Sequence, residues 1–199
     1  AVAQMTNLLV EVYRSQRRHL TAYDMADHLV PLMMGDVRWI PELEKETVAL
    51  LRVFLAEKWL VTRLHYGHVD PREAGVGNIV NCGAAMYMAP VGIVNAGDPR
   101  GAYAEAIDMA GAHQSSYGRE AAGVFAAAVA AAMGVGATVD DVLDAALGLS
   151  RDGTHAAIEA VLAAARTVPA GDWATAIPVL RDAIRPYDSV GEVYRAPAQ

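Results

Sequence analysis

Residues 120–133 read EAAGVFAAAVAAAM, and this alanine-rich stretch points to the fold class of the chain. Alanine is the best helix former, and its small side chain lets neighbouring helices approach closely. The pattern reaches back to about residue 116 and stops at Gly134, a residue type that commonly follows a helix. We therefore predict a long, buried helix over residues 116–133.

The same region contains a long uncharged stretch, residues 121–137. A membrane-spanning helix needs about 20 strongly apolar residues. This stretch is shorter and consists mostly of alanine and glycine, so it predicts a buried helix and no membrane span.

The composition indicates one folded domain. The chain has 199 residues with 54% hydrophobic residues, 20% charged residues and a formal net charge of −7. The hydrophobic content excludes wholesale disorder, and the acidic excess argues against a nucleic-acid partner. The single cysteine, Cys82, excludes an intrachain disulfide and a zinc site built from cysteines. It also favours a reducing, cytoplasmic location.

Helical signals recur along the rest of the chain and predict a single all-α bundle of about eight helices. We find no convincing strand and expect an irregular tail over residues 186–199. The expected helices cover residues 2–13, 25–33 after a capping box at Thr21–Asp24, 41–55 with Pro41 in the first turn, 84–94 with an interruption at Pro90, 99–112, 116–133, a segment starting at Thr138, 154–167 and 173–185.

Residues 64–83 lack helical periodicity and form a long expected loop. Loops of this length in a compact domain are often functional. His65, His68 and Asp70 supply two imidazoles and a carboxylate, a plausible ligand set for zinc or iron, although the spacing specifies no fourth ligand. The alternative is a solvated polar loop, which we favour.

The end of this loop is its most informative part. Glycines at positions 75, 77 and 83 let a backbone approach a ligand, and a helix that starts near Ala84 would direct its first N–H groups into the loop. The pattern therefore fits a site for phosphate or carboxylate, or a tight turn that needs glycine for its geometry alone. It is neither a Walker loop nor a dinucleotide fingerprint.

Two single residues have open roles. His113 follows a predicted helix, where it can bind a ribose or phosphate or stabilise the helix end. Cys82 can act as a nucleophile or, as we expect, be a small buried residue. No pair of carboxylates at a specific spacing suggests a glycosidic acid and base, so the catalytic residues are not assigned.

The run Asn81–Gly92 (NCGAAMYMAPVG) followed by Ala96–Pro99 (AGDP) resembles the ADP-ribosylglycohydrolase family. His113, the triplet at residues 120–122 and the alanine helix follow in the family's order. The resemblance implies an all-α orthogonal bundle and hydrolysis of a ribosyl glycosidic bond, in an ADP-ribosylated side chain or a related compound. It also implies magnesium bound by acidic residues, with ADP-ribose or a related nucleotide as the partner.

Carried over by position, the implied substrate-binding residues are Asn81, Cys82, Gly83, Ala84 and His113. The family usually has Asn at the position of Cys82 and Arg at the position of Tyr87, so a related ribosyl substrate is a second expectation. The family's two acidic metal motifs have no counterpart in residues 1–199. We therefore expect the chain to be the central part of one domain, completed by other segments of the same protein and silent alone. The alternative is a non-catalytic helical interaction domain.

Overall fold

The computed structural model describes residues 2–187. Two compact units divide the chain, Ala1–Leu149 and Ser150–Gln199, and each is described by itself. Helices dominate both units, which confirms the predicted all-α class.

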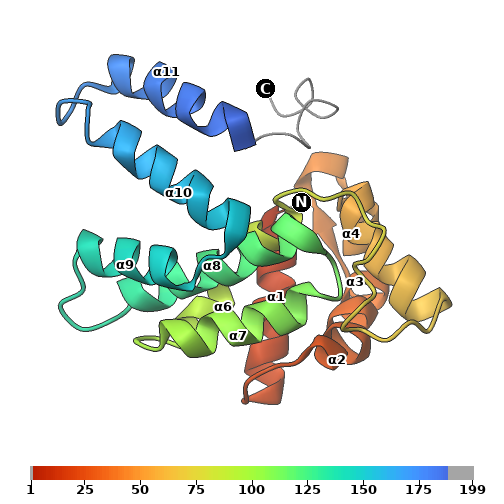
Figure 1. The fold of residues 1–199 in the computed structure, drawn as a ribbon. Coiled ribbons are helices and arrows are strands. Elements are labelled where there is room, and N and C mark those ends of the chain that lie inside the picture. Colours follow the sequence, from red (N-terminus) through yellow and green to blue (C-terminus); the bar gives the residue numbers. More distant parts are fainter. Residues whose placement is uncertain (1, 188–199) are drawn as a thin grey trace. The chain divides into compact units, whose positions relative to one another are not determined.

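The first unit contains nine α-helical segments among its described residues, drawn in Figure 1. Two of them, α2 and α4, continue directly into π-helical turns over Met25–Leu29 and Val61–Tyr66. The segments are α1 (Val2–Gln16), α2 (Ala22–Asp24), α3 (Val30–Gly35), α4 (Leu55–Leu60), α5 (Gly83–Met86), α6 (Ala89–Val94), α7 (Pro99–Ala110), α8 (Ser116–Ala132) and α9 (Val139–Leu149).

Small residues let α6, α7 and α8 pack closely beside one another (Figure 1). A Cβ atom added to Gly92 of α6 would lie 2.6 Å from the Ala126 carbonyl oxygen of α8. A Cβ on Gly123 of α8 would lie 2.8 Å from the Ile107 side chain of α7. Such distances leave no room for a larger residue, so the alanine and glycine content of this region sets the helix spacing.

The remaining core of this unit comes from larger apolar side chains. Met5, Leu8, Leu9 and Val12 form one buried stripe along α1 and are each at most 1% exposed. This stripe follows the i, i+3, i+4, i+7 spacing that predicted the helix.

One expectation was wrong between residues 37 and 55. Instead of a helix that begins at Pro41, the chain forms a two-stranded antiparallel sheet of β1 (Val37–Ile40) and β2 (Lys45–Val48). Val37 lies opposite Val48 and Ile40 opposite Lys45. Pro41 begins a short 3₁₀ turn, and Glu44 then adopts a left-handed backbone with φ of 49°. That backbone reverses the chain, so the helix cannot continue past this point.

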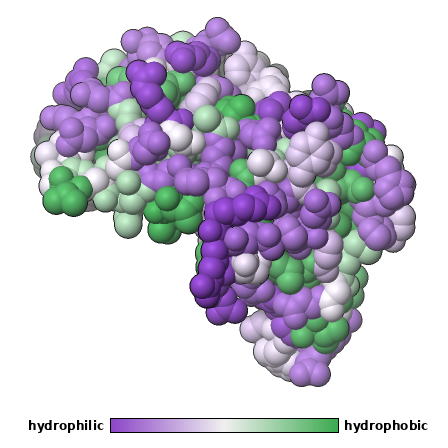
Figure 2. Space-filling model, turned by 90° about the horizontal axis from the view of Figure 1, so that it is seen from below, coloured by the Kyte–Doolittle hydropathy of each residue, from purple (hydrophilic) through white to green (hydrophobic). Residues whose placement is uncertain are grey.

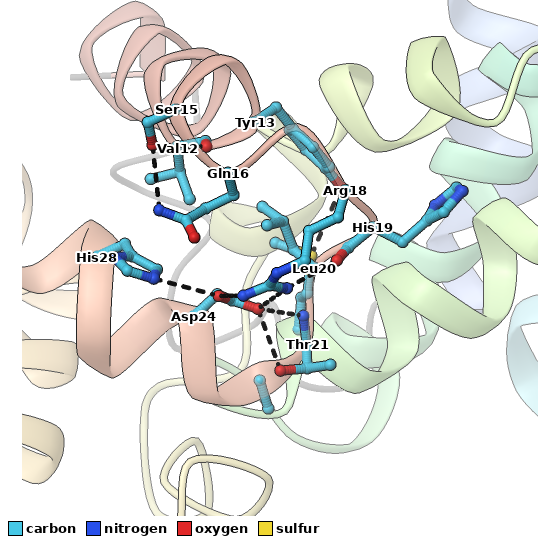
Figure 3. A network of polar contacts seen from close by, with 12 residues as sticks. Val12, Tyr13, Ser15, Gln16, Arg18, His19, Leu20, Thr21, Asp24 and His28 are labelled. Atoms are coloured by element: carbon cyan, nitrogen blue, oxygen red, sulfur yellow. Dashed lines mark hydrogen bonds and ion pairs between the residues drawn. The ribbon is translucent and has the colours of Figure 1, made fainter.

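The predicted capping box of Thr21 and Asp24 is present between α1 and α2, and the Asp24 carboxylate at its centre is buried (Figure 3). The Thr21 backbone N–H donates to Asp24 Oδ2 at 2.8 Å. The Arg18 guanidinium donates to both carboxylate oxygens, at 3.0 and 2.6 Å, and His28 Nε2 lies 3.5 Å from Asp24 Oδ1. Burial acts to raise the pKa of Asp24, but the hydrogen bonds from Arg18 and Thr21 outweigh it and lower the pKa.

A second carboxylate, Glu105 of α7, connects three segments. It accepts hydrogen bonds from Tyr13 Oη at 2.8 Å, from the Leu20 backbone N–H at 2.7 Å and from Asn95 Nδ2 at 2.7 Å. His19 Nδ1 lies 2.8 Å from Glu105 Oε2, the oxygen that Asn95 also binds. Glu105 therefore joins the end of α1 and the end of α6 to the middle of α7.

The second unit contains α10 (Asp152–Ala165) and α11 (Trp173–Ile184), close to the predicted bounds. The Asp172 side chain accepts a hydrogen bond from the Thr175 N–H at 3.1 Å and caps α11. Residues 185–187, which include the first two residues of the predicted irregular tail, form a 3₁₀ turn. Its remainder, 188–199, lies outside the described residues.

Hydrophilic side chains dominate the face drawn in Figure 2, and hydrophobic side chains lie between them in separate patches. Within residues 2–187, none of the helices has both the length and the apolar content needed to cross a bilayer.

Candidate functional site

The segment before α5 and the turn after α7 are joined by hydrogen bonds, although more than 25 residues separate them in the chain. The Gly75 N–H donates to the Gly111 carbonyl oxygen at 2.8 Å. A side chain at Gly75 would collide with the backbone of Gln114, so only glycine permits this approach. The structure thus brings together the glycine-rich segment and the His113 region that the sequence analysis singled out separately.

Asn78 connects these two segments to α4. It is 9% exposed, and its side-chain amide donates to the Ala56 carbonyl oxygen at 3.0 Å and to the His113 carbonyl oxygen at 2.8 Å. The side-chain oxygen of Asn78, Oδ1, accepts a hydrogen bond from the Ile79 backbone N–H at 2.8 Å. One buried amide therefore joins α4, the loop and the turn after α7.

Asn81 and Gln114 make the second connection. Gln114 Nε2 donates to Asn81 Oδ1 at 3.2 Å and to the Ile79 carbonyl oxygen at 3.0 Å. The Asn81 N–H donates back to Gln114 Oε1 at 3.3 Å. The side chain of Gln114 is 1% exposed, so these bonds are shielded from water and fix the course of the loop as it enters α5.

The start of α5 differs from the expectation. The helix has four residues, and its first N–H, from Gly83, donates to Asn81 Oδ1 at 2.7 Å. This amide is therefore bound by the chain itself and does not point freely into the loop. A helix of one turn also adds little dipole to attract an anion.

The bend at residues 81–84 is exposed on one side and buried on the other. Asn81 and Cys82 are exposed, whereas Gly83 and Ala84 are buried. The expectation that Cys82 is a small buried residue is wrong, because its thiol-bearing side chain faces solvent. Asn81 and Cys82 are thus accessible from solvent, and Gly83 and Ala84 pack inside the fold.

His113 lies beneath this bend and is 0% exposed. Its Nδ1 atom is 3.1 Å from Tyr87 Oη, and the two rings stack with centroids 5.7 Å apart and an interplanar angle of 24°. Burial lowers the pKa of His113 to about 4, although the Ala56 carbonyl opposes the shift. The imidazole is therefore neutral at physiological pH, and its Nδ1 atom shares a hydrogen bond with the Tyr87 hydroxyl group.

Glu57 also lies close to Gly83, as His113 does, and it was not among the residues predicted from the sequence. It lies in the first turn of α4 and is 4% exposed. Burial raises the pKa of its carboxyl group, while backbone N–H groups at Glu57 and Phe54 oppose the shift. Burial and the nearby Glu57 carboxyl group also raise the pKa of Tyr87. An acidic residue in a first helical turn looks like an ordinary capping residue, so no sequence signal marked its burial.

The proposed metal set His65, His68 and Asp70 does not converge. Asp70 binds Arg72 instead, with 2.6 Å between Asp70 Oδ2 and Arg72 Nη2, and the hydrogen bonds from Arg72 lower the pKa of Asp70 to about 2. His65 and His68 are exposed, as expected of solvated polar residues, but His65 lies in the π-helical turn Val61–Tyr66, so the expected loop begins only after residue 66.

No group of three or more His, Cys, Asp or Glu side chains in residues 2–187 could hold a metal ion. The described residues therefore do not by themselves fit the magnesium site that the resemblance implies.

Comparison with known proteins agrees with the residues quoted above. The family model described as ADP-ribosylglycohydrolase matches residues 2–196. No curated protein matches the chain. No solved structure matches it either.

Proposed function

Because the chain belongs to the ADP-ribosylglycohydrolase family, we propose that it contributes the ribosyl-binding part of a hydrolase that cleaves a ribosyl glycosidic bond. The substrate is an ADP-ribosylated side chain or a related ribosyl compound. Family membership supports hydrolase activity in general; the substrate and the binding residues are our proposal.

The observation that carries this proposal is the exposed edge of the bend at residues 81–84. Asn81 and Cys82 face solvent, and the backbone beneath them is fixed by Asn78, Gln114 and Gly75. We propose that Asn81 and Cys82 contact the ribose or phosphate oxygens. Gly83, Ala84 and His113 are buried and act from below by holding the shape of the bend. A preformed edge of this kind binds a ligand without the cost of ordering a loop.

Within residues 2–187, no cluster of side chains could bind magnesium. We propose that the acidic ligands belong to other segments of the same protein. The 199-residue chain then binds ADP-ribose but does not hydrolyse ADP-ribosyl arginine or serine, with or without added magnesium. The single cysteine supports a cytoplasmic setting for this activity.

The test measures ADP-ribose binding to the purified chain by titration calorimetry. Asn81→Asp keeps an oxygen acceptor for the Gly83 N–H but adds a negative charge beside the diphosphate. We expect it to weaken binding about tenfold or more through charge repulsion. Asn7→Asp is the matched control, because Asn7 is exposed on α1, and it should leave the affinity unchanged.

Two results would contradict the proposal. If the unmodified chain binds no ADP-ribose at millimolar concentration, the non-catalytic interaction domain becomes the better interpretation. Turnover of an ADP-ribosyl substrate by the chain alone would show that the 199-residue chain contains the whole reaction site.

A further inference from the structure

Glu57 is a buried carboxyl group that the proposed function does not yet use. It is the third residue of α4, and its side chain lies inside the unit with 4% exposure. Within residues 2–187 its Oε2 atom has no hydrogen-bond partner. A buried polar atom without a partner is costly, so its presence calls for a physical reason.

The other carboxyl oxygen, Oε1, lies next to Gly83. If Gly83 carried a Cβ atom, that atom would lie 3.1 Å from Glu57 Oε1, 3.1 Å from His113 Cε1 and 2.7 Å from Asn81 Oδ1. Three polar side chains, from α4, the loop and the turn after α7, thus come close to the position of Gly83. Among these three side chains, that of Glu57 comes from α4.

The neighbours of Glu57 hold α4 in place for this contact. The preceding residue, Ala56, accepts a hydrogen bond from Asn78. Trp59 Nε1 donates to the Ala74 carbonyl oxygen at 2.8 Å. Helix α4 is therefore attached to the loop on both sides of Glu57, which limits the freedom of Glu57 to move away from Gly83.

We propose that Glu57 is a positioning residue of the ribosyl-binding bend, whose carboxyl group holds Gly83 and His113 in the arrangement that presents Asn81 and Cys82 to the ligand. The inference rests on the proposed function of that bend. Glu57 itself does not contact the ligand. Its effect is transmitted through Gly83, whose N–H is bound to Asn81 Oδ1.

The experiment compares three variants of the chain by ADP-ribose titration, thermal unfolding and the amide NMR signal of Gly83. Glu57→Gln keeps the length of the side chain and one oxygen acceptor. Glu57→Asp keeps the carboxyl group but shortens it by one methylene, and Glu57→Ala removes it. Glu46→Asp is the matched control, because Glu46 is exposed on β2.

We expect Glu57→Gln to bind ADP-ribose within about threefold of the unmodified chain, and Glu57→Asp and Glu57→Ala to bind about tenfold more weakly. The Gly83 amide signal should shift in the Asp and Ala variants and stay in place in the Gln variant. Thermal unfolding of the Asp variant should change little, which separates positioning from a general loss of structure. If Glu57→Ala does not fold, the comparison of Gln with Asp decides.

The possible failures are distinguishable. Equal affinity in the unmodified chain, the Asp variant and the Gln variant overturns the role of Glu57 alone. An affinity that falls equally in the Gln and Asp variants also overturns it, because the conservative replacement then gives no rescue. If the unmodified chain binds no ADP-ribose, the proposed function and this inference fail together.

Discussion

Tyr87 and His113, 26 residues apart in the chain, lie face to face in the interior, with 3.1 Å between Tyr87 Oη and His113 Nδ1. Both are at most 1% exposed. From the sequence, Tyr87 is a departure from an arginine of the family, and His113 is expected beside the ligand. In the fold the two form a buried pair that supports the bend at residues 81–84.

The first prediction concerns the hydrogen bond of this pair. Tyr87→Phe keeps the ring but removes the hydroxyl group, which leaves His113 Nδ1 buried without its partner. We expect the free energy of unfolding to fall by about 1–3 kcal/mol, the cost of an unsatisfied buried polar atom. Urea unfolding at pH 7 measures the change. Tyr66→Phe is the control, because Tyr66 is 71% exposed, and an equal loss in both variants would contradict the prediction.

The second prediction concerns pH. The pKa of His113 is about 4 in the folded chain, against 6.5 for an unperturbed histidine. Between these values the unfolded chain binds a proton that the folded chain does not, so lowering the pH from 6.5 to 4 lowers the free energy of unfolding. The contribution of this one group approaches about 3 kcal/mol at the acid end and vanishes above pH 6.5.

NMR titration of the His113 imidazole checks this directly. Its signal, identified by its loss in His113→Asn and its retention in His65→Asn, should stay that of a neutral ring down to about pH 5. A midpoint near 6.5 would show that the ring is accessible to solvent in the folded chain.

The third prediction concerns Gly83. In Gly83→Ala the new methyl group would lie 2.7 Å from Asn81 Oδ1 and 3.1 Å from Glu57 Oε1. Relieving this contact must move the bend, so we expect a loss of about 1–3 kcal/mol in unfolding free energy. ADP-ribose binding should weaken in the same variant.

Gly148→Ala provides the control for that substitution. Gly148 lies in α9, and nothing lies within 4 Å of an added Cβ atom. Because alanine is the better helix former, this variant should gain up to about 1 kcal/mol. Thermal unfolding of both variants gives the comparison, and a loss of the same size at both positions would rule out a specific contact at Gly83.

The fourth prediction concerns Asp24, whose contacts are drawn in Figure 3. Asp24→Asn removes the charge that binds Arg18, and we expect the free energy of unfolding at pH 7 to fall by about 1–3 kcal/mol. The folded-state pKa of Asp24 lies below the ordinary 3.8. The stabilisation is therefore complete above pH 3.8 and is lost as the pH falls through the lower folded-state value.

Urea unfolding of Asp24→Asn and Asp27→Asn measures this effect. Asp27 is exposed on the following turn, so its variant should keep the stability of the unmodified chain. The prediction fails if the difference between Asp24→Asn and the unmodified chain persists undiminished at the lowest pH at which both remain folded.

Local signals predicted most of the helices. Residues 116–133 became α8 (Ser116–Ala132), and Asp98–Pro99 and Asp172 mark the starts of α7 and α11 as expected. These signals act within a few residues of the chain, through helix propensity and capping, so the sequence is sufficient to read them.

The sheet over residues 37–48 could not be read in the same way. Its turn contains no Asn-Gly or Asp-Gly pair, and Glu44 enters the left-handed backbone region without glycine. Pro41, a residue that favours the first turn of a helix, pointed to a helix at this place. Instead, residues 37–40 pair with residues 45–48, and this pairing overrides the local preference.

The sequence alone determined that the chain is helical, and through the run at residues 81–92 it indicated the family, because helix propensity, caps and a family motif are all local features. Only the tertiary structure decided which polar side chains share one site. Glu57, Asn78 and Gln114 meet at the bend because α4, the loop and the turn after α7 pack against one another. The energy of such contacts depends on distances between distant parts of the chain, and no local pattern in the sequence encodes those distances.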